Sequence, residues 1–231
     1  MSSVPPPKRH PYAQWSPDAR ALDVVGDKWT LRIVRDLAGG PRRFVDLQRT
    51  LPGISTEQLR SRLNRMVADA LLTRRRYREV PPRVDYELTD RARELFPVLA
   101  ALARWGQAWA WGEPRTGEWI DVGAILRLAP GLIRARRGTR GTVEATVTER
   151  SRDPSSRAYA LRFATGAVTL EERESPDAEA RVSGSERAWI AALGPGADRS
   201  ALRIEGDGAL AAALLDGLEP SAETRGAADV A

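Results

Sequence analysis

The feature that most constrains the fold of this chain is a series of three helical patterns followed by an arginine-rich hairpin pattern. The helical patterns are GDKWTLRIVRDL (26–37), PRRFVDLQRTLPGIS (41–55) and LRSRLNRM (59–66), and the hairpin pattern is RRRYREVPPRVDYELT (74–89). In this order they predict a helix that packs, a helix that crosses, a helix that is free to contact a partner, and a two-stranded hairpin.

The third helical pattern has one apolar face and one polar face. Its apolar positions are Leu59, Leu63, Met66 and Val67. At about 100° per residue, the opposite face carries Gln58, Ser61 and Arg65, with Arg60 and Arg62 at its edges. Ser55 and Gln58 form a capping-box pattern. Because arginine binds guanine edges and glutamine binds adenine edges in the major groove, this face favours DNA reading. A merely solvated charged face is the alternative.

The hairpin pattern is also cationic. Arg74, Arg75, Arg76 and Arg78 fall within five residues, and Pro81-Pro82 is typical of a turn. Val84, Tyr86 and Leu88 then alternate with polar residues, as in a half-buried strand. Such a hairpin can lie along a phosphate backbone or enter a minor groove, although arginines in a solvated strand can also serve solubility alone. A winged helix-turn-helix that contacts double-stranded DNA is therefore expected. The expected DNA contacts are Arg43, Ser55, Thr56, Gln58, Arg60, Ser61, Arg62, Arg65, Arg76, Arg78 and Arg83.

Residues 16–111 resemble the HxlR family of bacterial winged-helix regulators. The matching pieces are LDVVGDKWTLRIVRDL, GPRRFVDLQRTLPGIS, LRSRLNRMVADALLTR and REVPPRVDYELT. The resemblance implies a homodimer on inverted-repeat DNA, paired through the first helix and the long helix after the wing. Many members carry a cysteine just before the first helix, where this chain has Ser16. The chain contains no cysteine, which excludes a thiol-based switch.

Charge is divided unevenly along the chain. Residues 1–111 contain 20 Lys or Arg and 12 Asp or Glu, whereas the remainder contains 16 and 19. Clustered cations release counterions from DNA, so polyanion binding is assigned to the first half. The polar, proline-rich residues 1–15 predict a flexible leader without a signal-peptide core, and no apolar run is long enough to span a membrane. We therefore expect a cytoplasmic protein.

The chain is expected to have two domains and an α+β fold overall. The first is a DNA-binding and dimerisation domain (16–112) that ends in one long helix, Asp90 to Trp111, in which Pro97 can cause a kink. Leu95, Val98, Leu99, Leu102, Trp105 and Trp109 recur at helical spacing. Such an apolar stripe predicts a partner surface. The second domain (118–219) precedes an expected flexible tail (220–231).

The second domain has short alternating runs at 143–147, 159–163, 168–170 and 180–182. Helical runs lie at 122–136, which Pro130-Gly131 can break, and at 185–193 and 207–217. This pattern predicts a sheet covered by helices. Its ending, VSGSERAWIAALGPGADRSALRIEGDGALAAALLDGL, resembles the sterol carrier protein-like fold, with IEGD interpreted as a turn. That resemblance implies an apolar cavity for a hydrophobic ligand.

The residues expected around such a cavity are Trp119, Leu161, Phe163 and Trp189. A filled core is the alternative, because pattern alone does not distinguish a lined cavity from a packed one. His10 is the only histidine, and no phosphate-loop or nucleophile-elbow motif is present. We expect no catalytic residues, no metal and no cofactor.

The sequence as a whole predicts a dimeric transcriptional regulator, not an enzyme, whose second domain senses a hydrophobic small molecule. Two alternatives stay open: a regulator whose second domain only supports dimerisation, and a carrier of hydrophobic metabolites.

Overall fold

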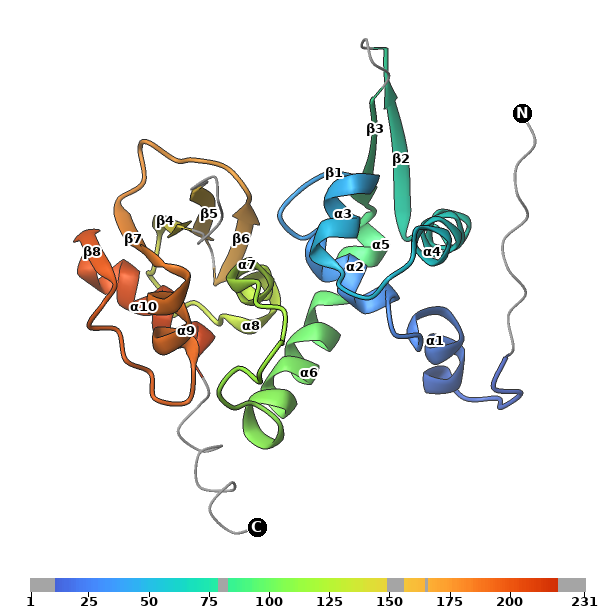
Figure 1. Ribbon diagram of the computed structural model, residues 1–231, viewed down its shortest axis with the longest axis horizontal. Helices are drawn as coiled ribbons and strands as arrows, with labels where there is room; N and C mark the ends of the chain where they lie inside the picture. Colours follow the sequence, from blue (N-terminus) through green and yellow to red (C-terminus); the bar gives the residue numbers. More distant parts are fainter. Residues whose placement is uncertain (1–10, 79–82, 149–155, 165, 220–231) are drawn as a thin grey trace. The chain divides into compact units, whose positions relative to one another are not determined.

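The computed structural model describes residues 11–78, 83–148, 156–164 and 166–219, and the chain divides into two compact units, Met1–Leu95 and Phe96–Ala231 (Figure 1). The first ten residues of the expected leader, with His10, lie outside the described residues, as do the Pro81-Pro82 turn and the expected tail from 220 onward.

The first unit contains five helices and one sheet within the described ranges. The helices are α1 (Pro17–Val25), α2 (Thr30–Asp36), α3 (Phe44–Thr50), α4 (Thr56–Ala68) and α5 (Asp90–Arg93). The strands are β1 (Arg42–Arg43), β2 (Leu72–Tyr77) and β3 (Arg83–Leu88). They form an antiparallel sheet in the order β1-β3-β2, in which β2 and β3 make the predicted wing.

The core of this unit is formed by apolar residues at helical spacing. Ile33 and Val34 of α2, Leu47 of α3, and Leu59 and Leu63 of α4 are fully buried. The predicted helix-turn-helix followed by a two-stranded wing is thus confirmed. Burial of these side chains holds α4 against the rest of the unit.

The predicted long helix from Asp90 to Trp111 is wrong as a single element. The structure has the short α5, a turn at Glu94 and Leu95, and then α6 (Phe96–Trp109). Pro97 lacks an amide hydrogen, and its ring would clash with the carbonyl of Arg93, so it is tolerated only in the first turn of a new helix. The compact units divide between Leu95 and Phe96, before α6, and not after 112.

The second unit is a five-stranded sheet with helices. Its helices after α6 are α7 (Val122–Leu126), α8 (Ala129–Leu132), α9 (Glu186–Leu193) and α10 (Gly208–Leu218). Its strands are β4 (Gly141–Thr148), β5 (Ser156–Ala164), β6 (Ala167–Glu171), β7 (Ala180–Ser185) and β8 (Arg203–Gly206). The strand order is β6-β5-β4-β7-β8; β4 and β7 are parallel, and the other neighbours are antiparallel.

One face of this sheet forms the core with the helices. The predicted inward residues of β4, β5 and β6 are buried together with residues of α6 to α10: Val143, Ala145, Val147, Tyr159, Leu161, Phe163, Val168 and Leu170. Two expectations are corrected. The run 122–136 is divided into α7 and α8 between Leu126 and Ala129, with Pro130 in the first turn of α8, and IEGD is largely strand β8, not a turn. Gly206 ends β8 with a φ of 78°.

A buried ion cluster lies at the edge of this core. The Arg127 side chain is fully buried and pairs with Asp121 at 2.9 Å and Glu172 at 3.4 Å. Its Nη2 also donates to the Tyr159 hydroxyl at 3.4 Å. Burial raises the pKa of Tyr159 to about 12, although Arg127 acts in the opposite direction. A buried guanidinium needs such partners, and they join α7 to β5 and the segment after β6.

Gly206 provides a test of how the end of β8 packs against the start of β7. A Cβ at Gly206 would lie 2.2 Å from the Glu179 carbonyl oxygen, at a positive φ. We expect Gly206→Ala to destabilise the protein by about 2–4 kcal/mol, because clash and backbone strain combine. Thermal unfolding followed by circular dichroism measures this. The control is Gly208→Ala, whose Cβ meets nothing within 4 Å. Equal thermal unfolding midpoints for the two variants would contradict a close contact between Gly206 and Glu179.

Candidate nucleic-acid interface

Helix α4 is capped and oriented as its sequence predicts. The Ser55 hydroxyl accepts a hydrogen bond from the Gln58 backbone N–H at 3.2 Å, and Gln58 Oε1 accepts one from the Ser55 N–H at 3.1 Å. Leu59, Leu63 and Met66 are buried, which confirms the predicted apolar face. The capping box fixes where α4 begins, and the apolar face fixes which side is exposed.

The exposed side of α4 carries several of the expected contacts. Ser55, Thr56, Gln58 and Arg60 are exposed, and Ser61 is half-buried. The Gln58 side chain is occupied in part by the cap, and Thr56 Oγ1 accepts a hydrogen bond from Gln48 at 2.8 Å. Arg60 lies 3.8 Å from Glu57, and both side chains are more than half exposed. Screening by water makes that ion pair weak, so Arg60 is the available cation of this face.

Two arginines of α4 do not lie as expected. Arg65, interpreted as facing outward, is buried at 9% exposure, and its Nε is buried without a hydrogen-bond partner. A helical wheel considers one helix alone, whereas other parts of the unit cover the C-terminal half of α4. Arg62 pairs with Asp27 at 3.0 Å and is 28% exposed. It therefore anchors α4 to the segment before α2.

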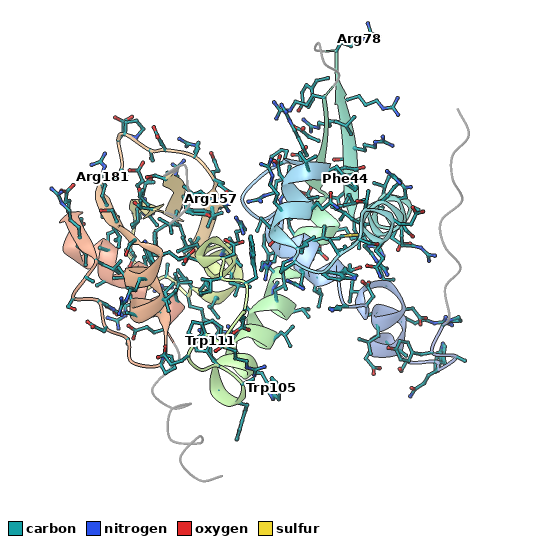
Figure 2. All side chains as sticks on the ribbon, viewed as in Figure 1. Phe44, Arg78, Trp105, Trp111, Arg157 and Arg181 are labelled. Atoms are coloured by element: carbon teal, nitrogen blue, oxygen red, sulfur yellow. The ribbon has the colours of Figure 1, made fainter. Side chains whose placement is uncertain are left out.

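The strand register divides the wing arginines between two faces. Arg74 is opposite Tyr86 and Arg76 is opposite Val84, so these four residues share one face. Arg75 lies on the other face, opposite Asp85, and its Nε is 3.0 Å from Glu87. Arg74, Arg75, Arg76 and Arg78 are all exposed, and Figure 2 shows Arg78 just beyond the end of β2.

Arg83 is also held by a carboxylate. Its guanidinium binds buried Asp85 in a bidentate arrangement, with Nε at 2.9 Å from one oxygen and Nη2 at 2.7 Å from the other. Asp85 is 2% exposed. Such a pair fixes Arg83 in place, so the expectation that it is free to bind phosphate is not supported. Arg43 is exposed at the start of α3 and lies opposite Asp85 on the other side of β3.

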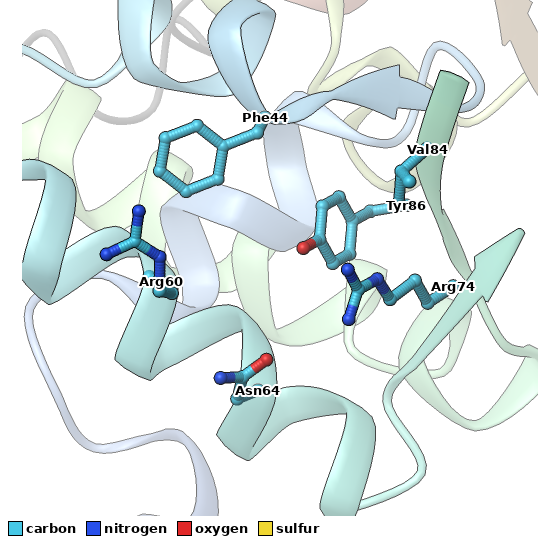
Figure 3. Close-up of a pocket in the computed structure, with 6 residues that line it drawn as sticks. All are labelled: Phe44, Arg60, Asn64, Arg74, Val84 and Tyr86. Carbon is cyan, nitrogen blue, oxygen red and sulfur yellow. The ribbon is translucent and has the colours of Figure 1, made fainter. Parts of the chain in front are cut away.

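A groove of about 300 Å³ separates α4 from the wing (Figure 3). It is lined by Phe44, Arg60, Asn64, Arg74, Val84 and Tyr86. Sequence reasoning named Arg60 but missed Asn64, one turn further along α4. It also missed Phe44 and did not select Arg74 from the arginine run. The four-residue spacing of Arg60 and Asn64 was a usable signal, since residues at that spacing share a helix face.

The residues expected around a C-terminal cavity are not together at one site. Leu161, Phe163 and Trp189 are buried in the core of the second unit, and the Trp189 indole donates to the Thr146 carbonyl at 3.0 Å. Trp119 is 61% exposed, so its expected place in a cavity wall is not supported.

Among the described residues, none of the helices is long and apolar enough to cross a membrane.

Comparison with known proteins shows which family the first half of the chain resembles. A family model described as HxlR-like helix-turn-helix matches residues 24–114. An uncharacterized HTH-type transcriptional regulator of Synechocystis sp. is 40% identical over 93 residues, which cover 40% of this chain and 69% of the relative. One of Halalkalibacterium halodurans is 40% identical over 94 residues, covering 40% of this chain and 83% of the relative.

The chain belongs to the HxlR family. A solved structure of the redox regulator HypR in its reduced form is 34% identical and has a TM-score of 0.39, covering 40% of this chain and 92% of that one. The HxlR match extends from the last residues of α1 through α6 and therefore crosses the division between the two compact units at Leu95.

Proposed function

We propose that this HxlR-family chain is a DNA-binding transcriptional regulator. The observation that carries the proposal is that exposed guanidiniums from two elements, Arg60 of α4 and Arg74 of the wing, border one groove. Cations from a helix and an adjacent wing can engage a major groove and its phosphates together. The relatives from Synechocystis sp. and Halalkalibacterium halodurans carry the description HTH-type transcriptional regulator, which supports this assignment. A regulator of this kind acts where the DNA is, in the cytoplasm.

The proposed contacts differ from the set expected from sequence. Base edges are assigned to Arg60, Thr56 and Ser61, which are exposed or half-buried polar residues of α4. Gln58 and Ser55 lie at the start of the helix, where backbone N–H groups favour phosphate. Arg43, Arg76 and Arg78 are assigned to phosphate or the minor groove. Arg62, Arg65 and Arg83 are removed from the set, because each is buried or bound to a carboxylate.

Substitutions at the two elements should act differently on DNA binding. With a duplex selected from a random-sequence library, Arg60→Gln should cost about 1–3 kcal/mol and relax preference at one base position. Arg76→Gln should weaken binding to all sequences alike and reduce the slope of log affinity against log salt by about one unit. Fluorescence anisotropy over a salt series measures both effects.

The control for these variants is Arg187→Gln, which removes an exposed arginine on α9 of the second unit. It changes net charge by the same amount and should leave affinity and salt slope unchanged within error. If Arg187→Gln weakened binding as much as the other two, general charge and not the proposed interface would account for the affinity.

We also propose that two copies pair through α6. Its exposed apolar residues are Val98, Leu102, Trp105 and Trp109, which are between 48% and 62% exposed. They recur on one side of the helix, while Leu99, Ala100 and Ala108 on the other side are buried. Figure 2 shows Trp105 projecting from α6. Large apolar groups gathered on one helix face favour a partner surface, and a second copy supplies a self-complementary one.

Replacing one tryptophan of this face should separate the copies. Trp105→Glu places a charge in the proposed contact and should convert a dimer into a monomer at micromolar concentration, as measured by sedimentation velocity. Trp119→Glu is the matched control, because Trp119 is equally exposed but lies outside α6. A wild-type monomer, or equal dissociation by both variants, would contradict pairing through α6.

For the second unit, the proposed role is to hold a hydrophobic effector, in keeping with its sterol-carrier-like pattern. The supporting observation is an apolar sheet face closed by helices on one side. Two other roles, support of the dimer and transport of a metabolite, stay open. Burial of Leu161, Phe163 and Trp189 is required equally by a filled core and by a closed cavity.

Native mass spectrometry of the purified chain distinguishes these roles. A hydrophobic ligand held in a closed cavity should appear as a mass adduct that is released on denaturation. Extracted ligand added back should change the affinity for operator DNA, because an effector that binds two states of the protein unequally shifts their populations. A bare protein mass, with no effect of added hydrophobic ligands on DNA binding, would leave the supporting role.

A further inference from the structure

The groove between α4 and the wing combines aromatic surface with unpaired polar groups. Tyr86 is only 6% exposed and forms part of its inner wall, whereas Arg60 and Arg74 are exposed at its border. Figure 3 shows Arg60 and Asn64 of α4 on one side, Phe44 and Val84 across from them, and Arg74 next to Tyr86. At about 300 Å³ the groove is at the lower end of the range for small-molecule sites.

Most of the polar groups that line this groove have no partner among the described residues. Within the part of the chain that the structure describes, Arg74 has no carboxylate partner, and neither the Asn64 amide nor the Tyr86 hydroxyl has a hydrogen-bond partner. Arg60 has only the 3.8 Å approach to Glu57. By contrast, Arg75 and Arg83 on the opposite face of the wing are held by Glu87 and Asp85.

We propose that this groove binds a small aromatic carboxylate. Phe44 and Tyr86 both line the groove, and a single ring placed there can make the stacking and edge contacts that favour aromatic ligands. Arg60 and Arg74 supply two guanidiniums for the carboxylate, and charge-assisted hydrogen bonds of this kind are the stronger ones. The Asn64 amide and the Tyr86 hydroxyl can donate to the same group or to a ring substituent. An apolar wall with a few convergent polar groups is the usual composition of a ligand site.

Occupancy of this groove would compete with DNA, a consequence that rests on the proposed function. Arg60 and Arg74 are among the cations proposed to meet DNA, and a bound carboxylate neutralises both. The ligand and the duplex would then exclude one another without any conformational change. This site differs in position and in ligand chemistry from the hydrophobic site proposed for the second unit.

Binding is tested first without DNA, on the full chain, with 4-fluorobenzoate as the probe in a fluorine NMR titration. We expect saturable binding with a Kd of about 1 mM or tighter, the range for a ligand of this size. Neutral 4-fluorobenzamide and non-aromatic trifluoroacetate should bind at least about tenfold more weakly, because each lacks one of the two recognised features.

Neighbouring arginines of β2 give the matched pair of variants. Arg74→Gln should weaken probe binding about fivefold or more, whereas Arg75→Gln, on the opposite face of the strand, should change it less than about twofold. Tyr86→Phe keeps the ring and removes only the hydroxyl, so it should retain the fold and weaken binding modestly. Circular dichroism and thermal midpoints establish that each variant is folded.

Three results would overturn the site: no saturable binding, equal loss in Arg74→Gln and Arg75→Gln, or equal binding of trifluoroacetate, which would indicate an anion on a cationic surface only. A second arm adds DNA: the probe should lower duplex affinity at concentrations that match its NMR-derived Kd, and trifluoroacetate at equal ionic strength should not. Probe binding without DNA binding would overturn the proposed function and keep the site. DNA binding without probe binding would overturn the groove site and keep the proposed function.

Discussion

Burial of one face of α4 is the constraint on which the proposed interface depends. Leu59, Leu63 and Met66 are almost fully buried, and their burial sets the rotation of the helix about its axis. Each such side chain contributes about 1.5–3 kcal/mol when buried, whereas an exposed arginine pair contributes about 1 kcal/mol or less. The apolar face therefore decides the rotation, and Arg60 and Asn64 face the wing as a consequence.

Carboxylates then decide which arginines are available. Asp27 binds Arg62, Asp85 binds Arg83 and Glu87 binds Arg75. A guanidinium already held in this way is fixed in position and partly neutralised, so it is less available to a phosphate than an unpaired one. The arginines that line or border the groove have no comparable restraint among the described residues. The wing and α4 thus acquire a directed cationic surface because Asp27, Asp85 and Glu87 occupy three of their arginines.

Helix α6 connects the two halves of the functional proposal. It falls within the HxlR match, yet it packs in the second compact unit, where Ala100 joins the core and Gln107 donates to the Leu218 carbonyl at 2.9 Å. The face proposed to pair two copies is therefore carried by a helix whose other face belongs to the core of the second unit. If two copies pair as proposed, a change in that core would reach the proposed contact through α6 itself.

The sequence by itself determined the elements whose signals are local. Helical spacing in α4, its cap at Ser55, the alternation in the wing and the inward strand residues of the second unit all depend on residues within a few positions of one another. Only the tertiary structure decided that Arg65 is buried, that Arg62 is bound to Asp27, and that a groove separates α4 from the wing. These depend on segments that meet only after folding, and no periodicity within one segment records which distant segment will cover it.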